Sequence, residues 1–336
     1  YTGTFTTGGG LFAVAQDFSW PLTMQANISI QREITRNLSV GAAWVGTKSS
    51  RLPFGRDVNY PIATPTATTA GANVLARRPN PAFGAVTLLD SDQNASYNGL
   101  QLTVNFRMSK LVTLNAFYTL SETLSSVQLH NNTTQGLAQN YTRLAQEQGR
   151  ADTDQRHVFT ASLNFQPDFY KGSNRIASFI LNGWSLSPII KMRSGRPFSI
   201  TNGGVDANLD GVTGTDRADL IGDPYLANPT AQQWFNTAAF VRNLAVTGLP
   251  KEGNSPRNLL TGPAYSVVDM ALSRDFRFGE RFKLRVRAEG TNILNNPNYD
   301  LPGNAVPATG STSSTFGVIS GAGPMRRLQF GFRLTF

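Results

Sequence analysis

The stretch Arg326-Arg327-Leu328-Gln329-Phe330-Gly331-Phe332-Arg333-Leu334-Thr335-Phe336 decides the fold of this 336-residue chain. Apolar side chains occupy every even position from 328 to 336, whereas glutamine, glycine, arginine and threonine occupy the odd positions between them. Successive side chains of a β-strand point to opposite faces, so this stretch predicts a strand with one apolar and one polar side. Residues 281–291 repeat the pattern with four basic residues in a row on the polar side. Such a face indicates contact with water, either bulk solvent or the wet lumen of a barrel.

The period of two recurs along the whole chain and predicts about nine or ten strands. They cover residues 22–34, 38–47, 97–108, 112–120, 156–166, 179–193, 265–276, 281–291 and 326–336, with a weaker candidate at 11–17. Short turns alternate with long loops at about 48–95, 122–155, 195–262 and 294–325. Soluble domains seldom hold so many long loops, whereas outer-membrane barrels have short periplasmic turns and long extracellular loops. The sequence therefore predicts an all-β fold, an antiparallel transmembrane β-barrel of the bacterial outer membrane.

Composition narrows the function classes. Charged residues make up 15% of the chain, the net charge is +9, and there is no cysteine. The lack of cysteine excludes disulfides and cysteine-ligated metal centres within the sequence. The two histidines, His130 and His157, belong to no catalytic motif, so we expect no enzyme activity. The basic residues alternate around the strands instead of clustering with aromatics, so we expect no nucleic-acid partner. Aromatics near strand ends, such as Trp184 and Phe276, are typical of the headgroup region.

An ordered series of segments resembles the TonB-dependent outer-membrane receptors of the Oar-like branch. The segments span residues 22–33, 43–48, 97–102, 117–122, 154–159, 183–188, 194–198, 234–240, 287–299 and 327–336. The resemblance implies that residues 1–336 are the C-terminal part of a 22-stranded barrel, a size known for outer-membrane transporters. It also implies a plug and an N-terminal carboxypeptidase-regulatory-like domain, and we find neither in this sequence.

The family's function supplies the leading hypothesis. The resemblance implies a receptor that imports an extracellular ligand, of unknown identity, with energy passed from the TonB complex through the missing plug. Outer-membrane lipid is the other partner that it implies. Two alternatives stay open. One is a passive porin-like or adhesin-like barrel, and the other is a soluble β protein that binds carbohydrate.

One loop carries a candidate metal site. The run Asp206-Ala207-Asn208-Leu209-Asp210-Gly211 resembles the start of a calcium loop, and Asp216 is the next acidic residue. Oxygen ligands at alternate positions can converge on one hard cation. Calcium bound by Asp206, Asn208, Asp210 and Asp216 is therefore a hypothesis, beside a metal-free loop built from Asx turns. No other cofactor is expected.

Two further groups are candidate ligand-contacting residues. Basic residues on the polar strand faces predict a lumen wall that favours an anionic ligand; they are Arg107, Arg193, Lys283, Arg285, Arg287 and Arg333. The alternative is a wall neutralised by Asp269, Asp275 and Glu289. Aromatic and polar residues in the longest loop predict ligand recognition; they are Arg196, Phe198, Trp234 and Phe235. The alternative, which we favour for the last two, is that they pack the loop onto itself.

Overall fold

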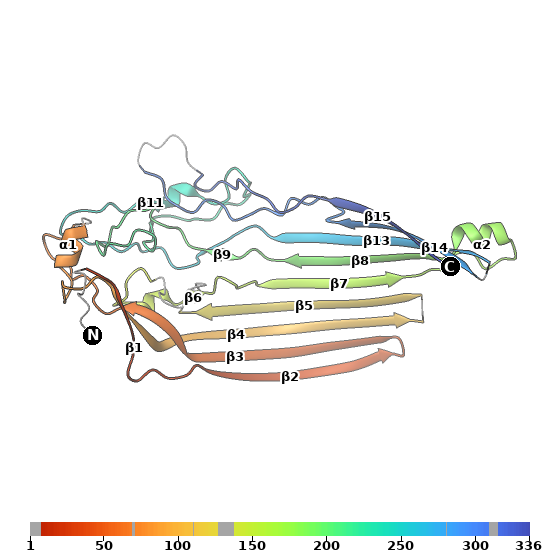
Figure 1. The fold of residues 1–336 in the computed structure, drawn as a ribbon, viewed down its shortest axis with the longest axis horizontal. Helices are drawn as coiled ribbons and strands as arrows, with labels where there is room; N and C mark the ends of the chain where they lie inside the picture. Colours follow the sequence, from red (N-terminus) through yellow and green to blue (C-terminus); the bar gives the residue numbers. More distant parts are fainter. Residues whose placement is uncertain (1–7, 69–70, 110, 127–137, 280, 309–314) are drawn as a thin grey trace.

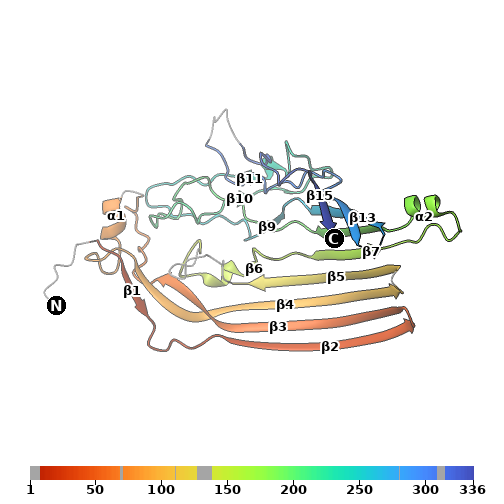
Figure 2. The ribbon, with the colours of Figure 1, turned by 45° about the vertical axis from the view of Figure 1, so that its right-hand side comes forward.

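The computed structural model describes residues 8–68, 71–109, 111–126, 138–279, 281–308 and 315–336, and these residues form one curved wall of strands. The main sheet has 11 strands, and its path runs β15-β14-β13-β8-β7-β5-β4-β3-β2 with antiparallel pairing throughout. The strands along the path are β2 (Leu22–Thr35), β3 (Leu38–Asp57), β4 (Val86–Met108), β5 (Val112–Ser125), β7 (His157–Phe165), β8 (Trp184–Arg193), β13 (Tyr265–Phe278), β14 (Phe282–Thr291) and β15 (Arg327–Thr335). The predicted antiparallel all-β fold is confirmed, and the sheet is open between β2 and β15 (Figures 1 and 2).

The smaller elements lie off this path. Two short strands attach to the main sheet, β1 (Leu11–Val14) beside β4 and β6 (Gly149–Arg150) beside β5. Two two-stranded sheets pair β9 (Pro197–Phe198) with β12 (Leu260–Thr261) and β10 (Asp219–Leu220) with β11 (Phe240–Val241). The helices are α1 (Gly71–Ala76), α2 (Arg175–Leu181), η1 (Leu144–Glu147) and η2 (Thr237–Ala239). No helix in the described ranges is long and apolar enough to cross a membrane.

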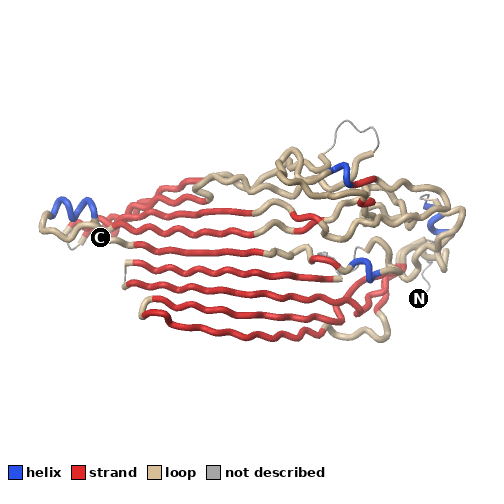
Figure 3. Tube along the Cα trace, turned by 180° about the vertical axis from the view of Figure 1, so that it is seen from behind, coloured by secondary structure: helices blue, strands red, loops and turns tan. Residues whose placement is uncertain are grey.

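The two ends of the sheet differ in their connections. The turns between β2 and β3, β4 and β5, and β13 and β14 lie at the end that also holds the C-terminus and α2, which we call the turn end (Figures 1 and 3). The long connections gather at the opposite end, which we call the loop end. This alternation is the one expected for an outer-membrane barrel.

The strand register assigns each side chain to a face. Arg285 lies opposite Asp275 on β13 and opposite Arg333 on β15, so these charged residues share one face, the inner face. The other face carries the apolar residues of the period-two pattern, and many of them are exposed, including Ile28 at 73% and Phe332 at 73%. A soluble sheet would bury such a face against another layer. Its exposure here fits contact with lipid.

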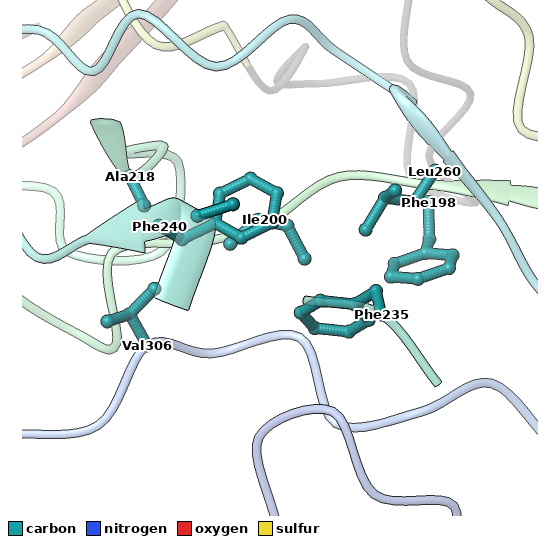
Figure 4. Packing of buried hydrophobic residues seen from close by; sticks show 8 residues of the cluster. Phe198, Ile200, Ala218, Phe235, Phe240, Leu260 and Val306 are labelled. Atoms are coloured by element: carbon teal, nitrogen blue, oxygen red, sulfur yellow. The ribbon is translucent and has the colours of Figure 1, made fainter. Parts of the chain in front are cut away.

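The buried hydrophobic cluster lies among the loops and not on the sheet. It consists of Phe198, Ile200, Ala218, Phe235, Ala239, Phe240, Leu260 and Val306 (Figure 4). Segments between residues 198 and 306 thus pack on one another at the loop end, and we call this assembly the loop layer. A barrel wall can dispense with a core of its own because lipid covers its apolar face.

Several observed strands are longer than predicted, β3 and β4 most of all. Strands β3 and β4 continue to Asp57 and start at Val86, respectively, so they extend into the predicted 48–95 loop. The alternation is lost there because the register shifts between Ser49 and Leu52 and again between Leu52 and Phe54. Arg51 takes a positive φ of 58° within this irregular segment. Irregular pairing moves side chains between faces, which hides a strand from a period-two reading.

The predicted 179–193 strand is wrong in its first part. Residues 175–181 form α2, and β8 begins only at Trp184. Gly183 separates the two elements with a φ of 83°, a conformation that other residues rarely adopt. The weak 11–17 candidate is shorter than predicted, and β1 pairs with β4 in parallel. Local patterning carries no information on such a long-range partner.

Candidate functional site

The inner face of the sheet carries all six basic residues predicted for the lumen wall. Arg285, Lys283 and Arg287 alternate along β14, and Arg333 lies beside Arg285. Cross-strand pairs of β13, β8, β7, β5 and β4 continue the same face to Arg193 and Arg107. The register therefore brings the six basic residues, which come from four strands of the path, onto one surface.

Acidic neighbours neutralise only part of this face. Asp275 accepts hydrogen bonds from Arg285 at 2.6 and 2.9 Å and forms an ion pair with Lys283 at 2.9 Å. Arg287 pairs with Glu289 at 2.5 Å. Asp269, the third acid proposed from the sequence, pairs instead with Lys191 at 3.8 Å.

The remaining three basic residues have no acidic partner among the described residues. The Arg193 guanidinium lies 4.4 Å from the ring centroid of Tyr265, and Arg107 and Arg333 form no ion pair. The inner face thus combines ion pairs near Asp275 with unpaired positive charge elsewhere. Both of the sequence-based alternatives describe a part of it.

A hollow of 1280 Å³ lies on the inner face near the turn end. Its lining includes Asp275, Arg277, Arg285 and Arg287 together with polar residues of the β7–β8 connection. The charges on its wall suit a polar or anionic guest, and the ion pairs fix their positions.

The four loop residues predicted for recognition are not equally accessible. Phe198 and Phe235 are 5% and 2% exposed and belong to the loop-layer cluster (Figure 4). Trp234 packs against that cluster, and its indole Nε1 donates to the carbonyl of Thr261 at 2.9 Å. Only the Arg196 side chain is exposed. Packing of the loop onto itself thus describes the aromatic residues, and Arg196 remains available to a ligand.

The acidic loop at 206–216 is folded around its own backbone. The Asp206 carboxylate accepts from the amides of Asp210 and Gly211 at 2.9 and 2.8 Å. Asp216 Oδ2 accepts from the amide of Ala207 at 2.7 Å. Asp210 accepts from the Tyr60 hydroxyl at 3.2 Å. These Asx-type contacts order the loop, as the metal-free alternative predicts.

Burial sets the electrostatics of this loop. Asp206, Asp210 and Asp216 are at most 3% exposed, and none of them forms an ion pair within the described residues. Burial raises the pKa of Asp210 to about 6 and that of Asp216 to about 7, and the neighbouring carboxylates add to both shifts. Asp216 Oδ1 has no hydrogen-bond partner. The folded loop therefore favours neutral carboxyls or a cation near them.

Calcium at this loop stays a prediction. Within the described ranges, no three His, Cys, Asp or Glu side chains are arranged so that they could hold a metal ion. Asn208, the fourth predicted ligand, donates to the carbonyl of Gln139 at 2.7 Å and so joins the loop to another connection. Each predicted ligand thus already has a contact that stabilises the loop.

We expect acid pH to stabilise the loop layer. A carboxyl whose pKa is raised by folding binds its proton more tightly in the folded state, so stability is highest below its ordinary pKa and falls as pH rises to about 7. Raising the pH from about 5 to about 8 should lower the stability of the 199–217 segment by about 2–3 kcal/mol. The measurement is the rate of limited proteolysis of this segment as a function of pH.

The controls are single substitutions of aspartate by asparagine. Asp216→Asn keeps an oxygen acceptor and should flatten the pH dependence, whereas Asp300→Asn at an exposed aspartate should leave it unchanged. An equal pH slope in native and Asp216→Asn protein would contradict the assignment. The same assay tests calcium at pH 8: protection that does not change on adding calcium and then chelator would rule out the metal hypothesis.

A buried ion pair that the sequence did not reveal joins the loops. Arg217 Nη1 donates to both carboxylate oxygens of Glu147 at 2.9 and 2.8 Å, and both side chains are buried. The Arg217 amide donates to Gln139 Oε1 at 2.7 Å. The available signal was an arginine at position twelve of the calcium-like run, where an EF-hand has glutamate. Its partner lies 70 residues away, beyond the reach of local patterning.

The two histidines bring no catalytic group together. His157 lies at the start of β7, where its Nδ1 is 2.7 Å from the hydroxyl of Tyr118. His130 lies outside the described residues. The absence of enzyme activity remains an expectation.

Comparison with known proteins identifies the kind of wall that these strands build. A family model described as "Outer membrane beta barrel domain" matches residues 1–329. No curated protein sequence matches the chain. The outer membrane transporter YddB from Escherichia coli is similar in structure, with a TM-score of 0.54 and 9% identity over 99% of this chain and 35% of that one.

Two other solved structures show weaker similarity. The FrpB iron transporter from Neisseria meningitidis has a TM-score of 0.45 and 12% identity over 97% of this chain and 33% of that one. The ferripyoverdine receptor of the outer membrane of Pseudomonas aeruginosa has a TM-score of 0.44 and 10% identity over 94% and 27% of the two chains. The chain thus spans about a third of the length of these structures.

Proposed function

Because this chain belongs to the outer membrane β-barrel domain family, and so to the bacterial outer membrane, we propose that it forms part of the wall of a TonB-dependent uptake receptor. In this proposal residues 1–336 are the C-terminal part of the barrel, and the plug lies in another part of a longer protein. The extracellular ligand enters through the lumen, and energy comes from the TonB complex through the plug.

The open sheet carries this proposal. Every residue of β2 and β15, the two edge strands, is exposed, and neither edge has a partner on its outer side among the described residues. Unpaired backbone groups cannot remain in lipid, so both edges require further strands to close a barrel. The similarity to 35% of a transporter agrees with a wall that is one part of a larger barrel.

The inner face suggests the charge of the ligand. Arg107, Arg193 and Arg333 lack an acidic partner on this face within the described residues, so they would favour an anionic guest in the lumen. The exposed apolar face disfavours the alternative of a soluble carbohydrate-binding protein. A passive porin or adhesin would share the same wall, so it remains the second candidate.

Two measurements on the full-length protein test the proposal. Binding of its periplasmic side to the isolated C-terminal domain of TonB should be detectable by calorimetry and lost when the plug segment is deleted. A passive barrel would show no such binding. Extraction should require detergent, and the mobility in a denaturing gel should change on heating. Release into buffer without detergent, with no change in mobility, would instead support the soluble alternative.

A further inference from the structure

Helix α2 gives the turn end an exposed apolar surface. The other described connections at this end are tight turns, whereas the β7–β8 connection spans 166–183 and contains the helix (Figure 1). The large apolar side chains of α2 are substantially exposed: Ile176 at 71%, Ile180 at 54%, Phe179 at 46% and Leu181 at 43%. Phe169, in the same connection, is 63% exposed. So much apolar surface on seven helical residues is unusual for a segment surrounded by water.

The helix is held in place at both of its ends. The Asn174 side chain caps its start by accepting from the amides of Ile176 and Ala177 at 3.0 and 3.2 Å. At the other end, Asn182 and the backbone of Tyr170 exchange two hydrogen bonds at 2.8 and 2.7 Å. Caps of this kind stabilise a helix that is too short to be stable by itself. The apolar side chains are therefore presented in a fixed orientation.

Aromatic contacts dock α2 on the apolar side of the sheet. The Phe179 ring lies 5.6 Å from that of Phe276 and 6.1 Å from that of Phe278, measured between centroids. Phe276 and Phe278 alternate along β13 with Asp275, which is on the inner face, so both rings belong to the apolar face. The exposed side chains of α2 thus extend the surface that the barrel presents to lipid.

An arginine strengthens this junction. The Arg274 guanidinium lies 4.2, 5.0 and 5.7 Å from the ring centroids of Phe276, Trp184 and Phe179. Arg274 is 8% exposed and also belongs to the apolar face. A cation surrounded by aromatic rings is typical of the membrane–water boundary, where apolar contacts and a charge must coexist.

The opposite side of α2 is polar. Arg175, Ser178 and Asn182 line the hollow on the inner face, as does Lys171 before the helix, and Phe179 lies at the border between the two sides because it lines the hollow and also packs on Phe276. The helix therefore lies at the rim of the wall, with water on one side and the apolar surface on the other. Interfacial helices show the same division, with basic residues on the polar side and large apolar residues on the other.

We propose that α2 is an interfacial helix that inserts Ile176 and Ile180 into the periplasmic leaflet of the outer membrane. The occupant of the apolar surface is phospholipid, because the surface is continuous with the lipid-facing side of β8 and β13. The insertion fixes the depth of the β7–β8 hairpin in the membrane. This inference rests on the outer-membrane location and does not require that the protein transports a ligand.

A fluorescent label can locate the helix. The chain contains no cysteine, so Ile176→Cys provides a single site in it for an environment-sensitive dye. The label is placed on the full-length protein in vesicles of phosphatidylethanolamine and phosphatidylglycerol. Ser173→Cys, at an exposed polar position in the same connection, is the matched control. Ile180→Cys is a second test site, and the heat-dependent gel shift verifies that each variant is folded.

We expect the dye at 176 to emit at shorter wavelength and to be quenched by lipids that carry a spin label near the headgroup. Aqueous iodide should quench the dye at 173 several-fold more than the dye at 176. Equal iodide quenching at 173 and 176, repeated at 180, would overturn the proposal.

Two other results would assign the apolar surface of α2 to a different occupant. Protection of the dye from iodide that appears only at high protein density would assign the surface to a second copy. Protection that appears only after a periplasmic extract is added would assign it to a protein partner. Either of these results would also overturn the lipid assignment.

Discussion

Replacing Arg217 with methionine is expected to lower the free energy of unfolding of the loop layer by about 3–5 kcal/mol. The side chain is 6% exposed, and it donates two hydrogen bonds to Glu147 and one, from Nε, to the carbonyl of Ser255 at 2.9 Å. Without the guanidinium, the Glu147 carboxylate stays buried as an unpaired charge, which costs more than the ion pair contributes. Hydrogen exchange of the backbone amides in residues 138–154 and 199–260 measures the change.

The matched control is Arg196→Met, at an exposed arginine of the same connection, for which we expect a change within about 0.5 kcal/mol. The double substitution Arg217→Met with Glu147→Leu should regain a large part of the loss, because it removes both buried charges. If the backbone amides are equally protected from hydrogen exchange in the Arg196→Met and Arg217→Met variants, the ion pair does not hold the loops together. A double variant as unstable as Arg217→Met would point to lost packing in place of lost charge balance.

Replacing Phe235 with alanine is expected to destabilise the same layer by about 3–5 kcal/mol. The ring is 2% exposed and packs against those of Phe240 and Phe198, with centroid distances of 5.7 and 6.0 Å (Figure 4). It also packs against the ring of Phe316 at 5.1 Å. Its removal leaves a cavity that three surrounding rings cannot fill without losing their own contacts. The measurement is the protease resistance of residues 198–262 as a function of temperature.

Val241→Ala provides the control for this prediction. Val241 belongs to the neighbouring strand β11 and is 44% exposed, so its truncation should cost under about 1 kcal/mol. Loss of ligand binding in Phe235→Ala without any loss of protease resistance would favour the recognition role for this residue. Equal destabilisation by the two variants would show that the cluster in Figure 4 does not hold the layer together.

The candidate site was predictable where a side chain's face follows from its position in a strand. Lys283, Arg285 and Arg287 could be assigned to the polar face because their alternation with apolar residues is visible in the sequence. Their acidic partners were harder to predict. Asp275 could be proposed as a partner because a short hairpin places its strand beside that of Lys283 and Arg285. The pairing of Asp269 with Lys191 depends instead on the register between β13 and β8, which are far apart in the sequence.

The contacts within the loops could not be predicted for a different reason. Phe235 could be named as a residue that packs the loop, but its contacts with Phe198 and Phe316 join segments that are distant in the chain. The run 206–216 resembles a calcium loop because aspartate and asparagine at alternate positions favour both metal ligation and Asx turns. The burial of its carboxylates results from the packing of the loop layer, and the spacing of residues in the sequence does not predict it.

The sequence by itself determined the antiparallel strands, the two faces of the wall and the end at which the long loops gather. It could do so because the period of two is a local property of the extended backbone, and lipid on one face with water on the other leaves it visible in every strand. Only the tertiary structure decided that α2 interrupts the β7–β8 connection, that β1 pairs in parallel with β4, and that Arg217 meets Glu147. Each of these depends on contacts between residues far apart in the chain, whose energies appear only when the whole wall and its loops are assembled.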